Sequence, residues 1–134
     1  MPAKTCVVYV EDNEDNFLLV QRLLQASGEI EVIPAIDGIT GLQVVQEHRP
    51  ALVLLDLDIP LLSGLDLAQR IKADPDLQHI PLIAVSANVM RGERQACLDA
   101  GCVAFVEKPF DIIVFRDLVH AQLATAAAST TTDD

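Results

Sequence analysis

The sequence predicts an α/β fold, a doubly wound parallel sheet built from five successive βα units. Apolar runs of strand length alternate along the chain with longer stretches in which apolar residues recur at helical spacing. The apolar runs are rich in Val, Ile and Leu, which is typical of strands that helices cover on both faces. A regular strand–helix alternation favours parallel strands joined by right-handed crossovers.

The expected strands are short β-rich runs, and in chain order they are residues 6–10, 30–35, 51–55, 82–85 and 103–106. The first (CVVYV) and third (ALVLL) are continuous apolar runs. The second (IEVIPA) is weaker, because Pro34 has no N–H to donate and therefore suits an edge position or a strand end. The fourth strand follows Pro81 and the fifth follows Gly101, so a turn residue precedes each.

The expected helices follow these strands at residues 13–26, 38–48, 65–73, 89–100 and 111–126. The first carries an apolar stripe that includes Phe17, Val20 and Leu24. Turn-forming residues end the first four helices, in order Ser27-Gly28, Arg49-Pro50, Asp74-Pro75 and Gly101. The last residues, 124–134 (ATAAASTTTDD), contain little apolar surface, so we expect a disordered tail after a single domain of residues 1–123.

Composition narrows the classes of function. A chain of 134 residues that is 51% apolar has the size of one domain with a substantial core. Its formal charge of −11 argues against binding to a nucleic-acid backbone and favours cations or basic partner surfaces. Since no apolar run approaches the roughly 20 residues that span a bilayer, we expect no membrane association and a cytoplasmic protein.

Polar residues follow four of the five expected strands. The first strand is followed by Glu11-Asp12, the third by Asp56, the fourth by Ser86-Ala87 and the fifth by Lys108-Pro109. In a doubly wound sheet, ligands bind beyond the carboxyl ends of the strands. The sequence therefore predicts that these residues gather at one edge of the sheet.

This set of residues has a specific chemistry. Several carboxylates at one edge repel each other unless a hard cation neutralises them, and an oxygen-only ligand set suits Mg²⁺ or Mn²⁺. With its charge shielded, one carboxylate could attack a phosphoryl group while the Lys108 ammonium and the Ser86 hydroxyl bind the phosphoryl oxygens. The product would be an aspartyl phosphate. Taken singly, each residue also fits a helix cap or a turn, but their shared location favours a functional site.

The sequence resembles the receiver domain of the two-component response regulator family, the group that contains the small chemotaxis regulator. The similarity runs over residues 4–123. Its motifs are Glu11-Asp12 after the first strand, Asp56 followed by Pro60 and Gly64, Ser86-Ala87 after the fourth strand and Lys108-Pro109-Phe110 after the fifth. The resemblance implies a flavodoxin-like sheet with strand order 2-1-3-4-5.

The resemblance also implies a role for each of these residues. Asp56 would be the phosphoacceptor, and Mg²⁺ (or Mn²⁺) would be bound by Asp12, by Asp56, by Glu11 directly or through water, and by the backbone carbonyl of Asp58. Ser86, Ala87 and Lys108 would bind the phosphoryl group. The Lys108-Pro109 bond would be cis. Phe105 would form an aromatic switch together with Ser86, although a plain core aromatic on the fifth strand fits the same position.

Three residues depart from the commoner pattern of the family. Glu11 stands where Asp is usual, and its extra methylene could move the metal contact outward. Ser86 stands where Thr is usual and lacks the methyl group that restricts the Thr rotamer. Asp58 adds a carboxylate at the rim, where it could either repel the phosphoryl group or orient the attacking water. These two effects have opposite signs, so the lifetime of the phosphorylated state stays open.

Two other classes of protein share single features with this chain. The Asp56-Leu57-Asp58 triplet fits the DxD signature of haloacid-dehalogenase-like phosphatases. That class expects the motif on the first strand and a Thr or Val two residues after the second Asp, where this chain has Pro60. A flavodoxin-like electron carrier is the other alternative, but the acidic loop after the first strand is unsuited to a flavin phosphate. Turnover of a phosphate ester, or a bound yellow flavin, would identify them.

We therefore expect a single-domain response regulator that is a phosphoprotein of a phosphorelay and not an enzyme. Its phosphodonor would be a sensor histidine kinase or a histidine phosphotransfer protein. A downstream protein would bind the face of helix 4, strand 5 and helix 5, where residues 89–93 and Phe105 lie, and the family habit of phosphorylation-linked dimerisation makes a homodimer an option. A receiver excised from a hybrid kinase remains an alternative to a native single-domain protein.

Asp56 and Asp58 should differ in role although they are close in sequence. Side chains two residues apart on a strand point the same way, so both carboxylates would compete for one site if the third strand continued. Pro60 indicates that the strand has ended by Asp58, whose side chain is then free to turn aside.

Overall fold

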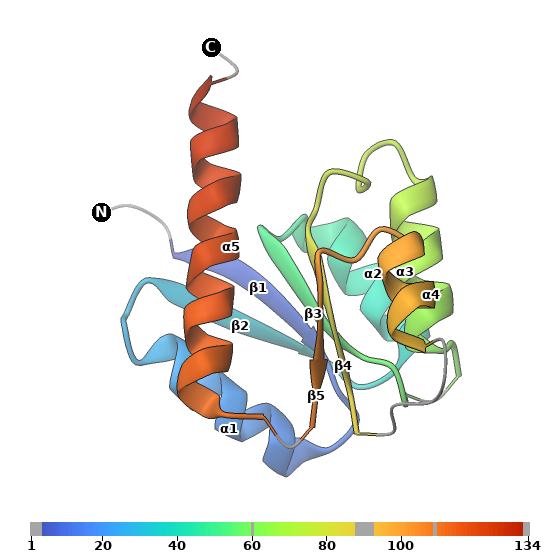
Figure 1. Cartoon of the computed structure of the whole chain (residues 1–134), viewed down its shortest axis with the longest axis horizontal. Helices are drawn as coiled ribbons and strands as arrows, with labels where there is room; N and C mark the ends of the chain where they lie inside the picture. The colour runs from blue at the N-terminus through green and yellow to red at the C-terminus, as the bar shows by residue number, and fades with distance from the viewer. Residues whose placement is uncertain (1–3, 60, 88–92, 109, 133–134) are drawn as a thin grey trace.

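The computed structural model describes residues 4–59, 61–87, 93–108 and 110–132. Within these residues the strands are β1 (Thr5–Val10), β2 (Ile30–Ala35), β3 (Leu52–Asp56), β4 (Leu82–Ser86) and β5 (Ala104–Glu107). The helices are α1 (Glu14–Gln25), α2 (Gly38–His48), α3 (Gly64–Ala73), α4 (Glu93–Asp99) and α5 (Ile112–Thr132). All strand pairings are parallel and the order is β2-β1-β3-β4-β5, which confirms the predicted fold and strand order (Figure 1).

Helices cover both faces of the sheet. Figure 1 shows α1 and α5 on one face and α2, α3 and α4 on the other. Each face has its own apolar core. The α1–α5 side includes Tyr9, Phe17 and Phe115, and the other side includes Leu67, Ile71 and Phe105. Because β3 and β4 are buried along their whole length, the middle of the sheet is a rigid platform for the residues at its carboxyl edge.

Side chains cap the first three helices at the same edge. Asn13 accepts the backbone N–H of Asn16 at 3.0 Å at the start of α1. Asp37 accepts the N–H of Thr40 at 2.7 Å at the start of α2, and Ser63 accepts from α3 at 3.1 Å. These caps satisfy N–H groups that lack partners inside a helix, so the sequence sets where each helix begins.

The structure differs from the sequence predictions mainly in the last two helices. The start of the expected helix 89–100 lies outside the described residues, and α4 begins at Glu93. The last helix does not end near residue 126, since α5 reaches Thr132 and covers most of the tail expected to be disordered. The segment is rich in Ala, the residue with the highest helix propensity, so the backbone continues as a helix. In the part of the chain that is described, no helix is long and apolar enough to cross a membrane.

Candidate functional site

Strand register brings the predicted site residues to one edge of the sheet. Val10 of β1 pairs with Leu55 of β3, so Glu11 and Asp56 both follow this rung. Asp56 in turn pairs with Val85 of β4, next to Ser86. The backbone N–H of Lys108 donates to the carbonyl of Ser86 at 2.8 Å, which places Lys108 at the same edge. Four strands therefore deliver Glu11, Asp56, Ser86 and Lys108 to one location, as the sequence predicted.

A three-residue charged cluster, Glu11–Lys108–Asp56, forms the centre of the site. The Lys108 ammonium lies 2.9 Å from Oε1 of Glu11 and 2.6 Å from Oδ2 of Asp56. Glu11 is 3% exposed and Asp56 is 4% exposed. A buried carboxylate normally needs an opposite charge and hydrogen bonds to compensate for the loss of water. Two buried carboxylates thus share one cation. The cluster carries an excess of negative charge that a proton or a further cation would balance.

The excess charge appears in the pKa values of the cluster. Burial, together with the neighbouring Asp56, raises the pKa of Glu11 to about 7 despite the opposing effect of Lys108. Burial alone would raise the pKa of Asp56, but hydrogen bonds from Glu11, from Lys108 and from the backbone of Asp58 outweigh it and lower this pKa. Asp56 is therefore the carboxylate that stays ionised, which is what a nucleophile at neutral pH requires.

Asp56 and Asp58 occupy different environments. β3 ends at Asp56, and the backbone N–H of Asp58 donates to Oδ1 of Asp56 at 2.8 Å. The side chain of Asp58 is exposed. The two carboxylates therefore do not share a site, in agreement with the split expected from the sequence. Pro60, on which that expectation rested, lies outside the described residues.

Gly64 lets the start of α3 pack directly against the backbone of Asp56 and Leu57. A Cβ atom at this position would come within 2.6 Å of the carbonyl oxygen of Asp56 and 2.7 Å of Cα of Leu57. Such distances are shorter than any tolerated contact, so only glycine fits without displacing Asp56. The close packing of α3 on the end of β3 therefore explains the glycine at position 64.

The remaining predicted residues differ in their exposure to solvent. Ser86 is fully buried at the end of β4, while Ala87 and Asp12 are exposed. Pro109 lies outside the described residues, so its peptide bond stays a prediction.

The donor set fits a hard cation. In the described residues no three His, Cys, Asp or Glu side chains are already arranged as a metal site. One of the expected ligands, however, is a backbone carbonyl, and Mg²⁺ usually keeps several waters and only one or two carboxylates. The uncompensated charge on two buried carboxylates, with Asp12 next in sequence, is the feature that suits such an ion.

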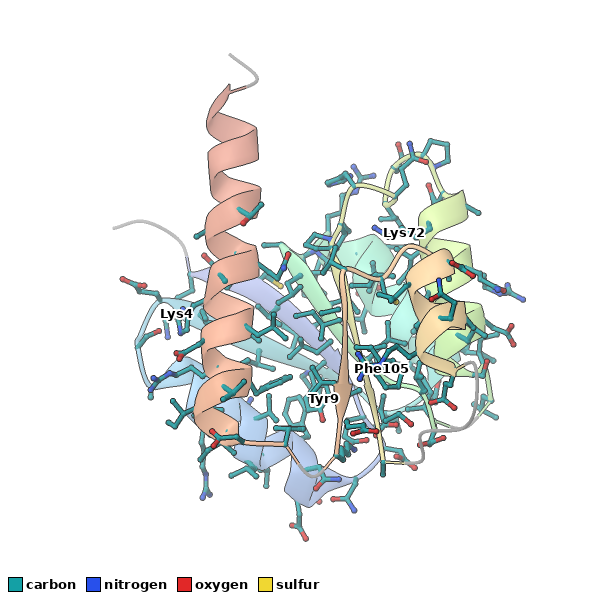
Figure 2. All side chains as sticks on the ribbon, viewed as in Figure 1. Lys4, Tyr9, Lys72 and Phe105 are labelled. Atoms are coloured by element: carbon teal, nitrogen blue, oxygen red, sulfur yellow. The ribbon has the colours of Figure 1, made fainter. Side chains whose placement is uncertain are left out.

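Phe105 lies on the face of the sheet opposite Tyr9, toward α4 (Figure 2). Its side chain is 7% exposed, and the Arg94 guanidinium of α4 lies 5.0 Å from its ring centroid. A cation at this distance is attracted by the ring. Sequence reasoning did not identify Arg94, because only the packing of α4 on β5 brings the two residues together.

Sequence reasoning also missed Tyr9, which contacts the charged cluster from the α1–α5 side of the sheet. Its hydroxyl donates to Oε1 of Glu11 at 3.4 Å. The alternation of side chains along β1 gave a signal, because residues 9 and 11 point to the same face. Tyr9 also borders a largely apolar cavity of about 380 Å³ beside the cluster, lined by Tyr9, Asn16, Leu19, Val20, Ala87, Lys108, Phe110 and Ile112.

Comparison with known proteins places this site in a family. The polar-differentiation response regulator DivK of Brucella anthropi is 39% identical over 120 residues, which is 90% of this chain and 97% of DivK. DivK of Brucella ovis is 38% identical over the same shares. Neither comparison supports the haloacid-dehalogenase alternative, and the DxD triplet here begins at the end of β3, the third strand of the chain.

Solved structures agree with this assignment. The receiver domain of the sensor histidine kinase PA1611 of Pseudomonas aeruginosa, described with a magnesium ion coordinated in its active site cleft, has a TM-score of 0.82 and 28% identity and covers 91% of this chain and 99% of its own. The chemotaxis protein CheY4 of Vibrio cholerae shares the fold, with a TM-score of 0.81, 21% identity and coverage of 89% and 98%. The family model for the response regulator receiver domain matches residues 7–120. The chain belongs to the response regulator receiver domain family.

Proposed function

We propose that this receiver accepts a phosphoryl group on Asp56 from a phosphohistidine of a sensor histidine kinase or histidine phosphotransfer protein. An Asp56 carboxylate oxygen attacks phosphorus, and the phosphorus–nitrogen bond of the donor breaks. The imidazole leaves with the bonding electron pair. The observation that carries the proposal is the environment of Asp56: a buried, ionised carboxylate that Lys108 contacts at 2.6 Å at the carboxyl edge of the sheet.

The cation proposed for the site is Mg²⁺, with Mn²⁺ as a substitute. Asp12, Asp56, the backbone carbonyl of Asp58 and Glu11, directly or through water, would hold it. When bound, Mg²⁺ supplies charge neutralisation between the carboxylates and the incoming phosphoryl oxygens. The excess negative charge of the charged cluster supports this proposal, as does the magnesium in the PA1611 receiver.

The other site residues bind the phosphoryl oxygens. The Lys108 ammonium already contacts Asp56 and needs only a small shift to reach an oxygen on the new phosphoryl group. Ser86 lies on the neighbouring strand β4, one residue after the partner of Asp56. The hydroxyl of Ser86 and the backbone N–H of Ala87 would bind two further oxygens of the phosphoryl group. When Lys108 moves from the carboxylates to the phosphoryl group, the Glu11 carboxylate becomes available to bind the metal.

The output surface is proposed to be the face of α4, β5 and α5. Ser86 moves toward the phosphoryl group, and Phe105 fills the space that Ser86 leaves. Because Arg94 of α4 lies over the Phe105 ring, a movement of this ring changes a contact of α4 directly. A downstream protein, or a second copy of the chain, would recognise the altered α4 surface.

The proposal extends to the location and the catalytic activity of the protein and to one peptide bond. It is proposed to be a cytoplasmic phosphoprotein with its receiver in residues 1–123. It catalyses only its own phosphorylation and slow dephosphorylation. The Lys108-Pro109 bond is proposed to be cis.

Intact mass measurement after incubation with acetyl phosphate and Mg²⁺ tests the proposal. We expect the wild-type protein and Asp58→Asn to gain one phosphoryl group, and Asp56→Asn to gain none. Asp58→Asn is the matched control, because it makes the same chemical change two residues away on an exposed side chain. Phosphorylation that survives in Asp56→Asn, or that only Asp58→Asn abolishes, would refute the assignment.

A further inference from the structure

Tyr9 lies next to the charged cluster although it contributes no ligand and no charge. It is the only tyrosine of the chain, which has no tryptophan. Its side chain is 1% exposed and lies on the α1–α5 side of the sheet (Figure 2). The ring stacks on Phe17 of α1 with a centroid distance of 5.9 Å. The position of the phenol is therefore fixed by β1 on one side and by α1 on the other.

The hydroxyl of Tyr9 connects this fixed ring to the cluster. It donates to Oε1 of Glu11 at 3.4 Å, and the same oxygen accepts from Lys108 at 2.9 Å. A buried phenol is costly without a hydrogen-bond partner, so Tyr9 and Glu11 satisfy each other. Apolar residues at position 9 would fill the same core volume. The hydroxyl is thus the part of Tyr9 that packing alone does not explain.

Glu11 depends on this contact because its cationic partner is shared. Lys108 also contacts Asp56, and in the proposed function it turns to the phosphoryl oxygens. Tyr9 cannot turn away in the same manner, because its ring is packed against Phe17. The Glu side chain has one more rotatable bond than Asp, so its carboxylate can adopt more positions through different rotamers. A fixed donor beneath it limits that choice.

We propose that Tyr9 is a positioning residue whose hydroxyl orients the Glu11 carboxylate for the divalent cation. The inference rests on the magnesium site of the proposed function. Hydrogen-bond partners of metal-binding carboxylates typically affect metal affinity by roughly 10- to 100-fold. The 3.4 Å contact is long for an O–H···O bond, so the effect here belongs at or below the lower end of that range.

The test is Mg²⁺ binding measured by calorimetry on the whole chain without a phosphodonor. We expect Tyr9→Phe, which keeps the ring, to weaken Mg²⁺ binding about three- to tenfold. In the Glu11→Gln background the same change should alter affinity by less than about 1.5-fold, because the two residues act through one contact. Val20→Ala is the matched control: it truncates another wall of the same cavity and should lower thermal stability with Mg²⁺ affinity unchanged.

The single tyrosine provides a second readout. Mg²⁺ should change the Tyr9 emission of the wild-type protein with the same midpoint as the calorimetric titration. Equal affinity of wild-type protein and Tyr9→Phe would overturn the inference, as would an effect of Tyr9→Phe that persists in full with Gln at position 11. A wild-type protein that binds Mg²⁺ with this Tyr9 dependence but gains no phosphoryl group on Asp56 would refute the proposed function and leave the inference standing.

Discussion

The site contains two inner and two outer carboxylates, and the contrast between them explains how similar side chains acquire different roles. The inner pair, Glu11 and Asp56, is at most 4% exposed and shares Lys108. The outer pair, Asp12 and Asp58, is exposed. One inner and one outer acid lie close together at each of two strand ends. Burial, not residue type, therefore decides which acid is held for chemistry and which stays in water.

Removing the shared cation should have the largest effect on this contrast. Lys108→Met leaves two buried carboxylates without their cationic partner, and breaking a buried ion pair in this way typically costs several kcal/mol. We expect the free energy of unfolding, measured by urea denaturation at about pH 8 without Mg²⁺, to fall by about 3 kcal/mol. The loss should be smaller at about pH 5, where Glu11 takes up a proton. A loss that is the same at both pH values would contradict the account.

The inner pair should also make stability depend on pH. The folded-state pKa of Glu11 is raised to about 7, above its ordinary 4.5, so the folded protein binds more protons than the unfolded chain between these values. The contribution of Glu11 to the free energy of unfolding is fully present below about pH 4.5 and is lost as pH rises through about 7. We expect a fall of about 2 kcal/mol between pH 5 and 8 in Mg²⁺-free urea denaturation.

Glu11→Gln provides the control for that measurement, because it keeps the size of the side chain and removes the titration. The fall between pH 5 and 8 should disappear in this variant. Asp56 does not add to it, since its pKa is lowered and its contribution is lost only at acid pH. An undiminished fall in Glu11→Gln would assign the pH dependence to other groups.

A smaller effect is expected at the contact between α4 and β5. Arg94→Ala removes the cation from the Phe105 ring, and such contacts contribute about 0.5–1 kcal/mol. Thermal unfolding should detect this loss. Arg94→Lys keeps the charge without the planar group and should recover part of it. If Arg94→Ala leaves stability unchanged, the stacked arrangement is not populated in solution.

The outer pair should contribute least to stability. Asp12→Asn and Asp58→Asn change exposed side chains, and such substitutions usually shift the free energy of unfolding by no more than about 0.5 kcal/mol. Asp12→Asn should nevertheless weaken Mg²⁺ binding, whereas Asp58→Asn should not, because only the backbone of Asp58 is a proposed ligand. Calorimetry on the two variants separates these outcomes. A large stability loss in either would mean that the outer acids are buried in solution.

The sequence predicted the fold and the location of the site for a clear physical reason. Continuous aliphatic runs and turn residues are local features of the sequence, and they predict the strands and helices. Parallel strands must then present their carboxyl ends at one edge of the sheet. The contacts of Tyr9 and Arg94 could not be predicted in this way. Tyr9 looked like one more apolar residue of β1, and Arg94 meets Phe105 only through tertiary packing.

The end of α5 shows the opposite limit. The sequence predicted that the last helix ends at about residue 126, but the Ala-rich segment that follows has a high intrinsic helix propensity. α5 reaches Thr132 and extends past the sheet in Figure 1.

Chemical identification of the phosphorylated residue tests the central claim most directly. Borohydride reduces an aspartyl phosphate to homoserine, so peptide mass spectrometry of the wild-type protein after acetyl phosphate and Mg²⁺ locates the acceptor without any mutation. We predict homoserine at position 56 and unmodified Asp at positions 12 and 58. Homoserine at position 12 or 58, with Asp56 intact, would contradict the assignment of the buried carboxylate as the nucleophile.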